Sequence, residues 1–338
     1  MALLTIDKPN RPSGRLTFMV RLVLALVAGA CLSGAHCARA PVEPPFTLKQ
    51  VAPNAWAAID NPKSPSPASS NAGFVIGNDG VTVIDTLGSL EAAKHLLVEI
   101  RRRTPLPLKF VINSHYHLDH VAGNAEFAAA GATILAQRNV RDWIHTENLR
   151  LLGPDISPEL KALAESFVAP TALYEDGVNV YAGTGTIQVR SFPGHTGGDS
   201  IVVIPDSRVA FLGDLFWRAM LPNLVDASTQ PWIDSLATIL DANGSGFTFV
   251  PGHGDVGDAS DLAAFRNYLV TLRALVADAR TQGKSGEALA QIVVPRLKEL
   301  YGGWEFIEPL AKDSALQTES ELRGTKRVPM MPGGGARD

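Results

Sequence analysis

Four side chains that can bind a metal ion lie within six residues, at His115, His117, Asp119 and His120. They follow the apolar run 109–113, which has the composition of a buried strand. In an extended stretch alternate side chains point the same way, so His115 and His117 can converge on one ion. Asp119 and His120 fall at a turn into a helix, where adjacent side chains diverge and can reach a neighbouring ion. Imidazole and carboxylate are ligands that zinc and iron accept.

Three more candidate ligands share one local design, in which a glycine stands between a predicted strand and the ligand. Glycine allows a side chain to be turned inward at a strand end and allows close backbone approach. A lone histidine after glycine is usually a core or surface residue, but three such steps together with the first cluster predict a metal centre. The three ligands are His195, Asp214 and His253, and the glycines are Gly194, Gly213 and Gly252.

The elements that must position these residues follow from the apolar spacing and the turn residues. Strands are predicted at 55–59, 73–76, 81–84, 109–113, 179–181, 186–191, 200–204, 208–212 and 247–250. Helices are predicted at 89–103, 122–129, 137–150, 158–167, 232–243, 259–282 and 285–300. Strand-rich blocks thus occur twice, each followed by helices. Two packed sheets with helices on both outer faces would bury this pattern.

The ligand pattern resembles the metallo-β-lactamase fold superfamily, over roughly residues 50–282. The resemblance rests on the series His115-x-His117-x-Asp119-His120 followed in order by Gly-His195, Gly-Asp214 and Gly-His253. It implies an α+β fold, a four-layer αββα sandwich of two mixed β-sheets flanked by helices. The metals would lie at one edge between the sheets.

The resemblance also implies a role for each residue, carried over by position. One metal is held by His115, His117 and His195, the other by Asp119, His120 and His253, and Asp214 bridges the two. Asp85, in the stretch Val83-Ile84-Asp85-Thr86, matches an aspartate that the family commonly places behind its metal ligands.

Such a centre predicts a hydrolase that depends on two zinc ions. Two divalent ions about 3.5–4 Å apart share a water and lower its pKa. The bridging hydroxide attacks a carbonyl or phosphoryl centre, and Asp119 is the catalytic residue that orients it. The predicted partner is a small-molecule substrate: a lactam, a thioester, a lactone or a related ester. No protein nucleophile is required.

The substrate within this range stays open. Asp214 stands where one type of β-lactamase has a zinc-binding cysteine, and it resembles instead the ligand of glyoxalase II-like thioesterases. Against glyoxalase II, the C-terminal region has no evident basic cluster for glutathione. Residues 213–223, with Trp232, are similar to exported hydrolases encoded with sulfur-oxidation and quinoprotein systems. Four residues that follow a ligand directly either line the substrate pocket or pack as loop residues: Trp217, Met220, Leu221 and Asn223.

Other functions compete with the zinc hydrolase. A mononuclear iron dioxygenase acting on persulfides keeps the same histidine cluster but uses only two histidines and one aspartate, so one Fe replaces two Zn²⁺. A true β-lactamase and a metal-binding protein without catalysis are further alternatives. Nucleic acid is disfavoured as a partner, because 30 basic residues face 34 acidic ones in the 338-residue chain. The oligomeric state is not predicted.

The N-terminus has the features of a secretory signal peptide at residues 1–40. A basic start precedes the short apolar run 22–28, and the segment ends in Ala38-Arg39-Ala40. Export to the periplasm or the exterior is therefore predicted, with no stable membrane span. Cys31 follows Ala28-Gly29-Ala30, which loosely resembles a lipid-attachment site, so a lipoprotein is the alternative.

The predicted cut changes the composition of what remains. Both cysteines and five of the basic residues lie within residues 1–40, together with one acidic residue. The mature protein then has 25 basic and 33 acidic residues, a formal charge of −8, and no thiolate ligand. Residues 41–312 form the predicted hydrolase domain, including C-terminal helices, and residues 313–338 a polar, flexible tail.

Overall fold

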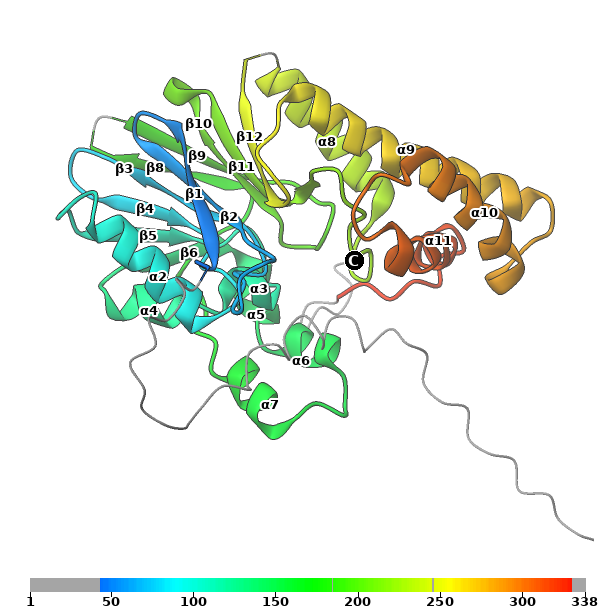
Figure 1. Cartoon of the computed structure of the whole chain (residues 1–338), viewed down its shortest axis with the longest axis horizontal. Coiled ribbons are helices and arrows are strands. Elements are labelled where there is room, and N and C mark those ends of the chain that lie inside the picture. The colour runs from blue at the N-terminus through cyan, green and yellow to red at the C-terminus, as the bar shows by residue number, and fades with distance from the viewer. Residues whose placement is uncertain (1–42, 184, 245, 330–338) are drawn as a thin grey trace, which may run out of the picture.

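Two β-sheets face each other and helices cover their outer sides (Figure 1). The computed structural model describes residues 43–183, 185–244 and 246–329. The predicted signal peptide, Cys31 and the end of the predicted tail lie outside these ranges. None of the helices within them is long and apolar enough to cross a bilayer.

Each sheet is formed by strands from one half of the sequence. The first has seven strands in spatial order: β1 (Phe46–Ala52), β2 (Ala55–Asp60), β3 (Ala72–Ile76), β4 (Val81–Ile84), β5 (Leu108–Ile112), β6 (Thr133–Gln137) and β7 (Ala172–Tyr174). The second has five, in the order β12 (Thr248–His253), β11 (Val209–Trp217), β10 (Ser200–Ile204), β9 (Gly185–Ser191) and β8 (Gly177–Ala182).

Both sheets are mixed. Strands β1 to β4 pair antiparallel, whereas β4 to β7 pair parallel. In the second sheet β8 to β11 pair antiparallel and β11 pairs parallel with β12. A turn joins β3 to β4, with Gly77 N donating to Gly80 O at 2.9 Å.

The helices lie mostly outside the sheets. They are α2 (Leu90–Arg101), α3 (Leu118–Val121), α4 (Asn124–Ala129), α5 (Arg138–Trp143), α6 (Thr146–Leu152), α7 (Pro158–Glu165), α8 (Thr229–Asn243), α9 (Ala259–Thr281), α10 (Gly286–Tyr301) and α11 (Ile307–Leu322). A short 3₁₀ turn spans Pro205–Ser207.

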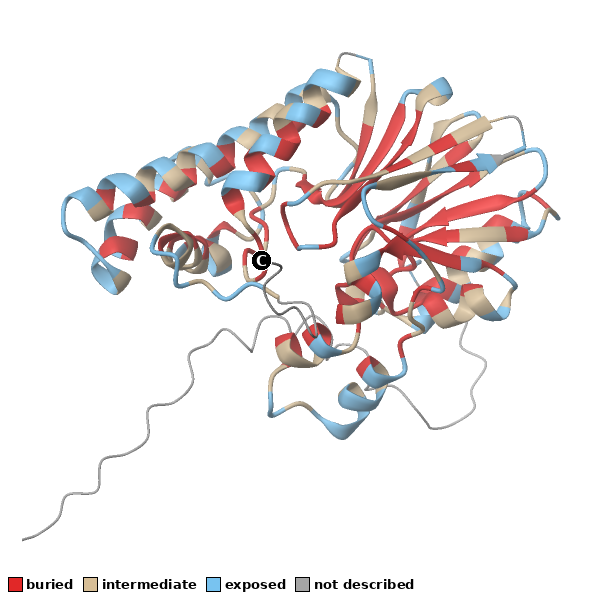
Figure 2. Cartoon of the chain, turned by 180° about the vertical axis from the view of Figure 1, so that it is seen from behind, coloured by how far each residue is buried: buried red, intermediate tan, exposed pale blue. Residues whose placement is uncertain are grey.

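Three apolar cores separate four layers, which confirms the predicted αββα sandwich. Between the sheets, Val75 and Ile112 pack in one cluster with Val202 and Phe211. Helices α2 and α4 cover the outer face of the first sheet, where Leu96 belongs to a second cluster. Buried residues fill the strands and the helix faces turned toward them (Figure 2).

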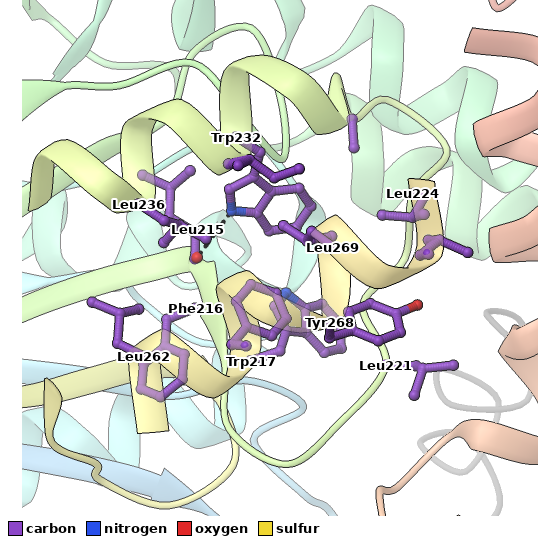
Figure 3. Close-up of a cluster of buried hydrophobic side chains, with 14 of the residues drawn as sticks. Leu215, Phe216, Trp217, Leu221, Leu224, Trp232, Leu236, Leu262, Tyr268 and Leu269 are labelled. Atoms are coloured by element: carbon purple, nitrogen blue, oxygen red, sulfur yellow. Dashed lines mark hydrogen bonds between the residues drawn. The ribbon is translucent and has the colours of Figure 1, made fainter. Parts of the chain in front are cut away.

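The third core joins the second sheet to α8, α9, α10 and α11. Trp232 of α8 is fully buried there and its Nε1 donates to the carbonyl of Leu215 in β11 at 3.0 Å (Figure 3). Leu215 follows the candidate ligand Asp214, so this contact fixes α8 against the strand segment that carries the ligand.

Helix α11 was not expected, because the polar tail is predicted to start at residue 313, inside this helix. Its acidic residues have structural partners. Glu321 accepts hydrogen bonds from Thr229 N at 3.0 Å, at the start of α8, and Glu319 accepts one from Gly286 N at 2.9 Å, at the start of α10. These carboxylates satisfy free N–H groups at two helix N-termini, where negative charge is favourable. The polarity of this segment therefore reflects capping of other helices.

Candidate metal centre

The structure brings all seven predicted ligands together at one edge of the sandwich. Their side chains form two groups whose ligand atoms lie within 4.8 Å of one another in each group. The first group is His115, His117, His195 and Asp214, and the second is Asp119, His120 and His253.

The first four ligands come from the connection between β5 and α3 and from the start of α3. The backbone of His117 is extended, with φ −60° and ψ 143°, and α3 begins at the next residue. The predicted change from an extended segment to a helix is therefore present, and it sends His115 and His117 to one group and Asp119 and His120 to the other.

The remaining ligands come from the second sheet. His195 lies in the loop between β9 and β10, and His253 is the last residue of β12. The sequence predicts that a strand ends at residue 212, but β11 continues through Asp214 to Trp217. Its pairing with β12 is irregular on both sides of Gly213, and this irregularity redirects the strand at the ligand.

Asp214 stands between the two groups and presents one oxygen to each. Its Oδ2 lies 3.1 Å from His195 Nε2 and 3.8 Å from His115 Nε2. Its Oδ1 lies 3.0 Å from His120 Nε2 and 3.3 Å from His253 Nε2. This is the arrangement that a bridging carboxylate requires.

The other ligand atoms complete the two groups. His117 turns Nδ1 toward His195 Nε2, at 3.0 Å. Asp119 Oδ2 lies 3.4 Å from His253 Nε2 and 3.7 Å from His120 Nε2. The side chain of Asp119 is the most exposed of the seven, at 19%.

Several of the buried ligand atoms have no hydrogen-bond partner within the described residues, as is expected of atoms that bind a metal ion. The unpartnered ligand atoms are His115 Nε2, His120 Nε2, His253 Nε2 and Asp214 Oδ1. A buried polar atom without a partner costs about 1–3 kcal/mol. Because these atoms converge and belong to nitrogen and oxygen ligands that zinc accepts, the residues fit two divalent ions.

Two of the predicted glycines have a definite steric role. Gly213 has φ +49°, in the left-handed region that other residues rarely adopt. A Cβ on Gly252 would lie 1.9 Å from Asp214 Oδ1. Glycine at these positions therefore lets β11 and β12 approach each other closely enough to place Asp214.

Asp85 lies behind both groups, as the resemblance implies. Its Oδ2 is 2.9 Å from His120 Nδ1, and it accepts hydrogen bonds from Ser114 N and Ser114 Oγ, both at 2.7 Å. Ser114 Oγ in turn lies 3.0 Å from His115 Nδ1. Such outer contacts fix the ring orientation of metal-binding histidines. Asp85 has φ +55°, so its backbone too is held in the left-handed region.

Asp226 contacts the ring of His117 from behind, as Asp85 contacts that of His120. Asp226 was not identified from the sequence as part of the site. Its Oδ2 lies 3.5 Å from His117 Nε2 and accepts a hydrogen bond from Tyr116 Oη at 2.6 Å. Arg150 of α6 donates to its Oδ1. Burial alone would raise the pKa of Asp226, but His117, Arg150 and Tyr116 outweigh burial and hold this pKa below its usual value. Asp226 is therefore a buried, charged partner of a candidate ligand.

The protonation of the centre reflects its buried charges. Burial lowers the pKa of His115 and of His195, which keeps both imidazoles in the neutral form that binds metal. Burial would also lower the pKa of His120, but the carboxylates of Asp214, Asp119 and Asp85 outweigh it and raise that pKa. The same carboxylates would stabilise a bound cation.

The four residues predicted to line a substrate pocket lie in different surroundings. Trp217 stacks on the ring of the ligand His253, with ring centroids 3.9 Å apart. Leu221 is fully buried in the third core. Met220 is partly buried, and its backbone forms an isolated parallel β-bridge with Glu305. Asn223 Oδ1 accepts a hydrogen bond from Val225 N at 2.9 Å. Of these four, Trp217 is the residue whose ring stacks directly on a candidate ligand.

Comparison with known proteins identifies the family. A model of the metallo-beta-lactamase superfamily matches residues 65–278. Among solved structures, a metallo-beta-lactamase from Pontibacter korlensis aligns with a TM-score of 0.55 and 20% identity, over 67% of this chain and 99% of that one. The two-sheet sandwich with its His and Asp site is the architecture of a metal-binding α+β protein. The chain belongs to the metallo-beta-lactamase superfamily, whose members are mostly metal-dependent hydrolases.

Curated relatives are distant and differ in activity. A linear primary-alkylsulfatase from a Pseudomonas species is 23% identical over 43% of this chain and 33% of its own length. A type 2 metallo-beta-lactamase from Pseudomonas aeruginosa is 25% identical, over 45% of this chain and 55% of its own. A hydroxyacylglutathione hydrolase from Brucella anthropi is 25% identical, over 48% of this chain and 56% of its own. The matches to these three span between a third and about half of each relative.

Proposed function

We propose that this protein is a hydrolase that depends on two zinc ions. The observation that carries the proposal is the placement of Asp214, with one carboxylate oxygen toward each of two ligand groups. The first group would hold one ion through His115, His117 and His195, and the second group the other through Asp119, His120 and His253. Bound divalent ions lower the pKa of water and polarise a substrate oxygen.

The side chains around the centre have separate tasks. Asp85 and Asp226 orient the ligand imidazoles from behind, and neither is exposed by more than 3%. Asp119 is the ligand most open to solvent, so its Oδ2 is placed to orient an attacking water and to accept its proton. The flat face of Trp217 covers His253 and shields this side of the centre from water.

The complete second group favours this function over a mononuclear iron dioxygenase. An enzyme with two histidines and one aspartate would need neither Asp119 nor His253 in position, yet here Asp119 approaches His120 at 3.7 Å and His253 approaches Asp214 at 3.3 Å. The alternative predicts one iron per protein molecule and oxygen uptake with a persulfide substrate.

The substrate that we propose is a small molecule with a hydrolysable acyl, phosphoryl or sulfuryl bond. Lactams, thioesters, lactones and related esters fit the chemistry of the centre. The names of the three relatives add alkyl sulfates, β-lactams and hydroxyacylglutathione to the compounds worth testing.

We also propose export through the N-terminal segment 1–40, with periplasmic or secreted protein as the product; sequencing the N-terminus of the mature protein tests this.

The proposal is tested by measuring metal content and hydrolysis in one preparation. The purified protein is expected to contain two zinc ions per molecule and to hydrolyse at least one compound of a lactam, thioester, lactone, sulfate ester and phosphodiester panel. Asp119→Ala serves as the inactive control. One iron per molecule with oxygen uptake, or a protein that takes up no divalent metal, would overturn the proposal.

A further inference from the structure

The segment that follows α11 returns to the loop that carries Asp226. It runs from the end of α11 toward α6 (Figure 1). Thr325 N and Lys326 N donate to the carbonyl of Ser320 at 2.9 and 3.1 Å, which fixes the base of the segment on α11. Lys326 and Arg327 then extend from this base to two other parts of the molecule.

Lys326 binds the backbone on both sides of Asp226. Its Nζ donates to the carbonyl of Leu224 at 2.6 Å and also to the carbonyl of Ala227. An ammonium group bound to two carbonyls cross-links the loop at these points. The segment therefore constrains the loop conformation that directs the Asp226 side chain.

Arg327 reaches Asp226 through α6. It binds Glu147 in a bidentate arrangement, with Nη1 and Nη2 at 3.0 and 3.1 Å from the two carboxylate oxygens. Glu147 also binds Arg150, and Arg150 donates to Asp226 Oδ1. Glu147 is 5% exposed, so this arrangement is not an ordinary surface ion pair.

Both routes end at a candidate ligand. Asp226 faces His117 Nε2, and His117 directs its other nitrogen into the first ligand group. A hydrogen bond at one ring nitrogen orients the other and raises its basicity. The loop and Arg150 are thus both connected to His117 through Asp226.

We propose that residues 325–327 form a clasp that positions Asp226 and, through it, the His117 ligand. Lys326 and Arg327 are its two positioning residues. The inference rests on the proposed metal centre and assigns a role to a segment that lies beyond residues 65–278, the part that matches the superfamily. Without the clasp the first ligand group binds its ion less tightly, although the ligands themselves are unchanged.

Zinc affinity of the full-length metal-free protein, titrated against a chromophoric chelator, tests this directly. Asp226→Asn is expected to weaken zinc binding about 10- to 100-fold, as removal of a partner behind a metal ligand does. Lys326 and Arg327 act on His117 only through Asp226, so Lys326→Met/Arg327→Met is expected to weaken zinc binding less, by about 3- to 10-fold. The matched control is Arg323→Met, whose side chain is 53% exposed, against 55% for Arg327, and whose ion-pair partner within the described part of the chain is Glu319.

A double-mutant comparison separates positioning from general destabilisation. If the clasp acts through Asp226, then Lys326→Met/Arg327→Met changes affinity less than about twofold in the Asp226→Asn background. The inference is overturned if Lys326→Met/Arg327→Met weakens zinc binding equally in the wild-type and the Asp226→Asn backgrounds. It is also overturned if Lys326→Met/Arg327→Met binds zinc with wild-type affinity. Should that variant not fold, Arg327→Met alone is expected to weaken binding, and unchanged affinity refutes the clasp. A wild-type protein that binds no zinc refutes the metal centre itself.

Discussion

Replacing Gly252 by alanine should disturb the metal centre without removing any ligand. The added Cβ would lie 1.9 Å from Asp214 Oδ1 and 2.8 Å from the carbonyl carbon of Gly213. Contacts under 3.0 Å are essentially never seen for real Cβ atoms, so these groups must separate by about 1 Å. Asn71 hinders movement of residue 252, because it donates to the carbonyls of Gly252, Pro251 and Gly254 at 2.8, 2.9 and 2.7 Å. Asp214 must therefore move instead.

The magnitude follows from this displacement. Overpacking a well-packed site costs about 1–3 kcal/mol of folding free energy. A displacement of about 1 Å in a catalytic group can lower the rate about a hundredfold. Since Asp214 faces both ligand groups, the binding of both ions is expected to weaken together rather than one alone.

Zinc titration and hydrolysis kinetics of Gly252→Ala test these values, with urea unfolding of the same samples. Gly303→Ala is the matched control, because a Cβ there meets no atom within 4 Å. The steric reasoning is refuted if Gly252→Ala binds two zinc ions with wild-type affinity and unfolds at the wild-type urea concentration.

Three further predictions concern catalysis, pH and metal removal. Asp119→Ala should lower kcat/KM by about 10²–10⁴-fold, as loss of a proton acceptor does, while far-ultraviolet circular dichroism keeps the wild-type spectrum; unchanged turnover would contradict the role. Burial raises the pKa of Asp199 from 3.8 to about 8, so its contribution to the free energy of unfolding is present at low pH and is lost as the pH rises through about 8. Asp199→Asn should flatten the change in unfolding free energy between pH 6 and pH 9, and a wild-type slope would contradict this. A chelator should remove activity faster at pH 6 than at pH 8, because histidines bind metal only when neutral; equal rates would argue against imidazole ligation.

The first ligands could be predicted because their positions depend on local geometry. An extended segment that turns into a helix sends His115 and His117 one way and Asp119 and His120 another, and the structure shows this division. The glycine before His253 indicated close backbone approach, and a Cβ on Gly252 would indeed overlap Asp214 of the neighbouring strand. These signals lie within a few residues of the ligand that they position.

Asp226 could not be predicted, because its role depends on a contact between distant segments. It lies 109 residues after His117, in a loop with no metal-binding pattern of its own. Helix α11 was missed for a related reason. Its buried face contains Ser314, Thr318 and Glu319, which pack against other helices, so the segment shows little apolar periodicity. For Leu221 the sequence left open whether the side chain lines a pocket or packs in the core, because proximity to a ligand along the chain does not decide which way a side chain faces; in the structure it is buried in the core.

Anomalous X-ray scattering from crystals of the zinc-loaded protein tests the central claim most directly. Data collected on both sides of the zinc absorption edge are expected to show two zinc peaks per protein molecule. One peak should contact His115, His117 and His195, the other Asp119, His120 and His253, with Asp214 between them. A single peak, an iron signal in place of zinc, or zinc bound away from these residues would contradict the two-zinc centre.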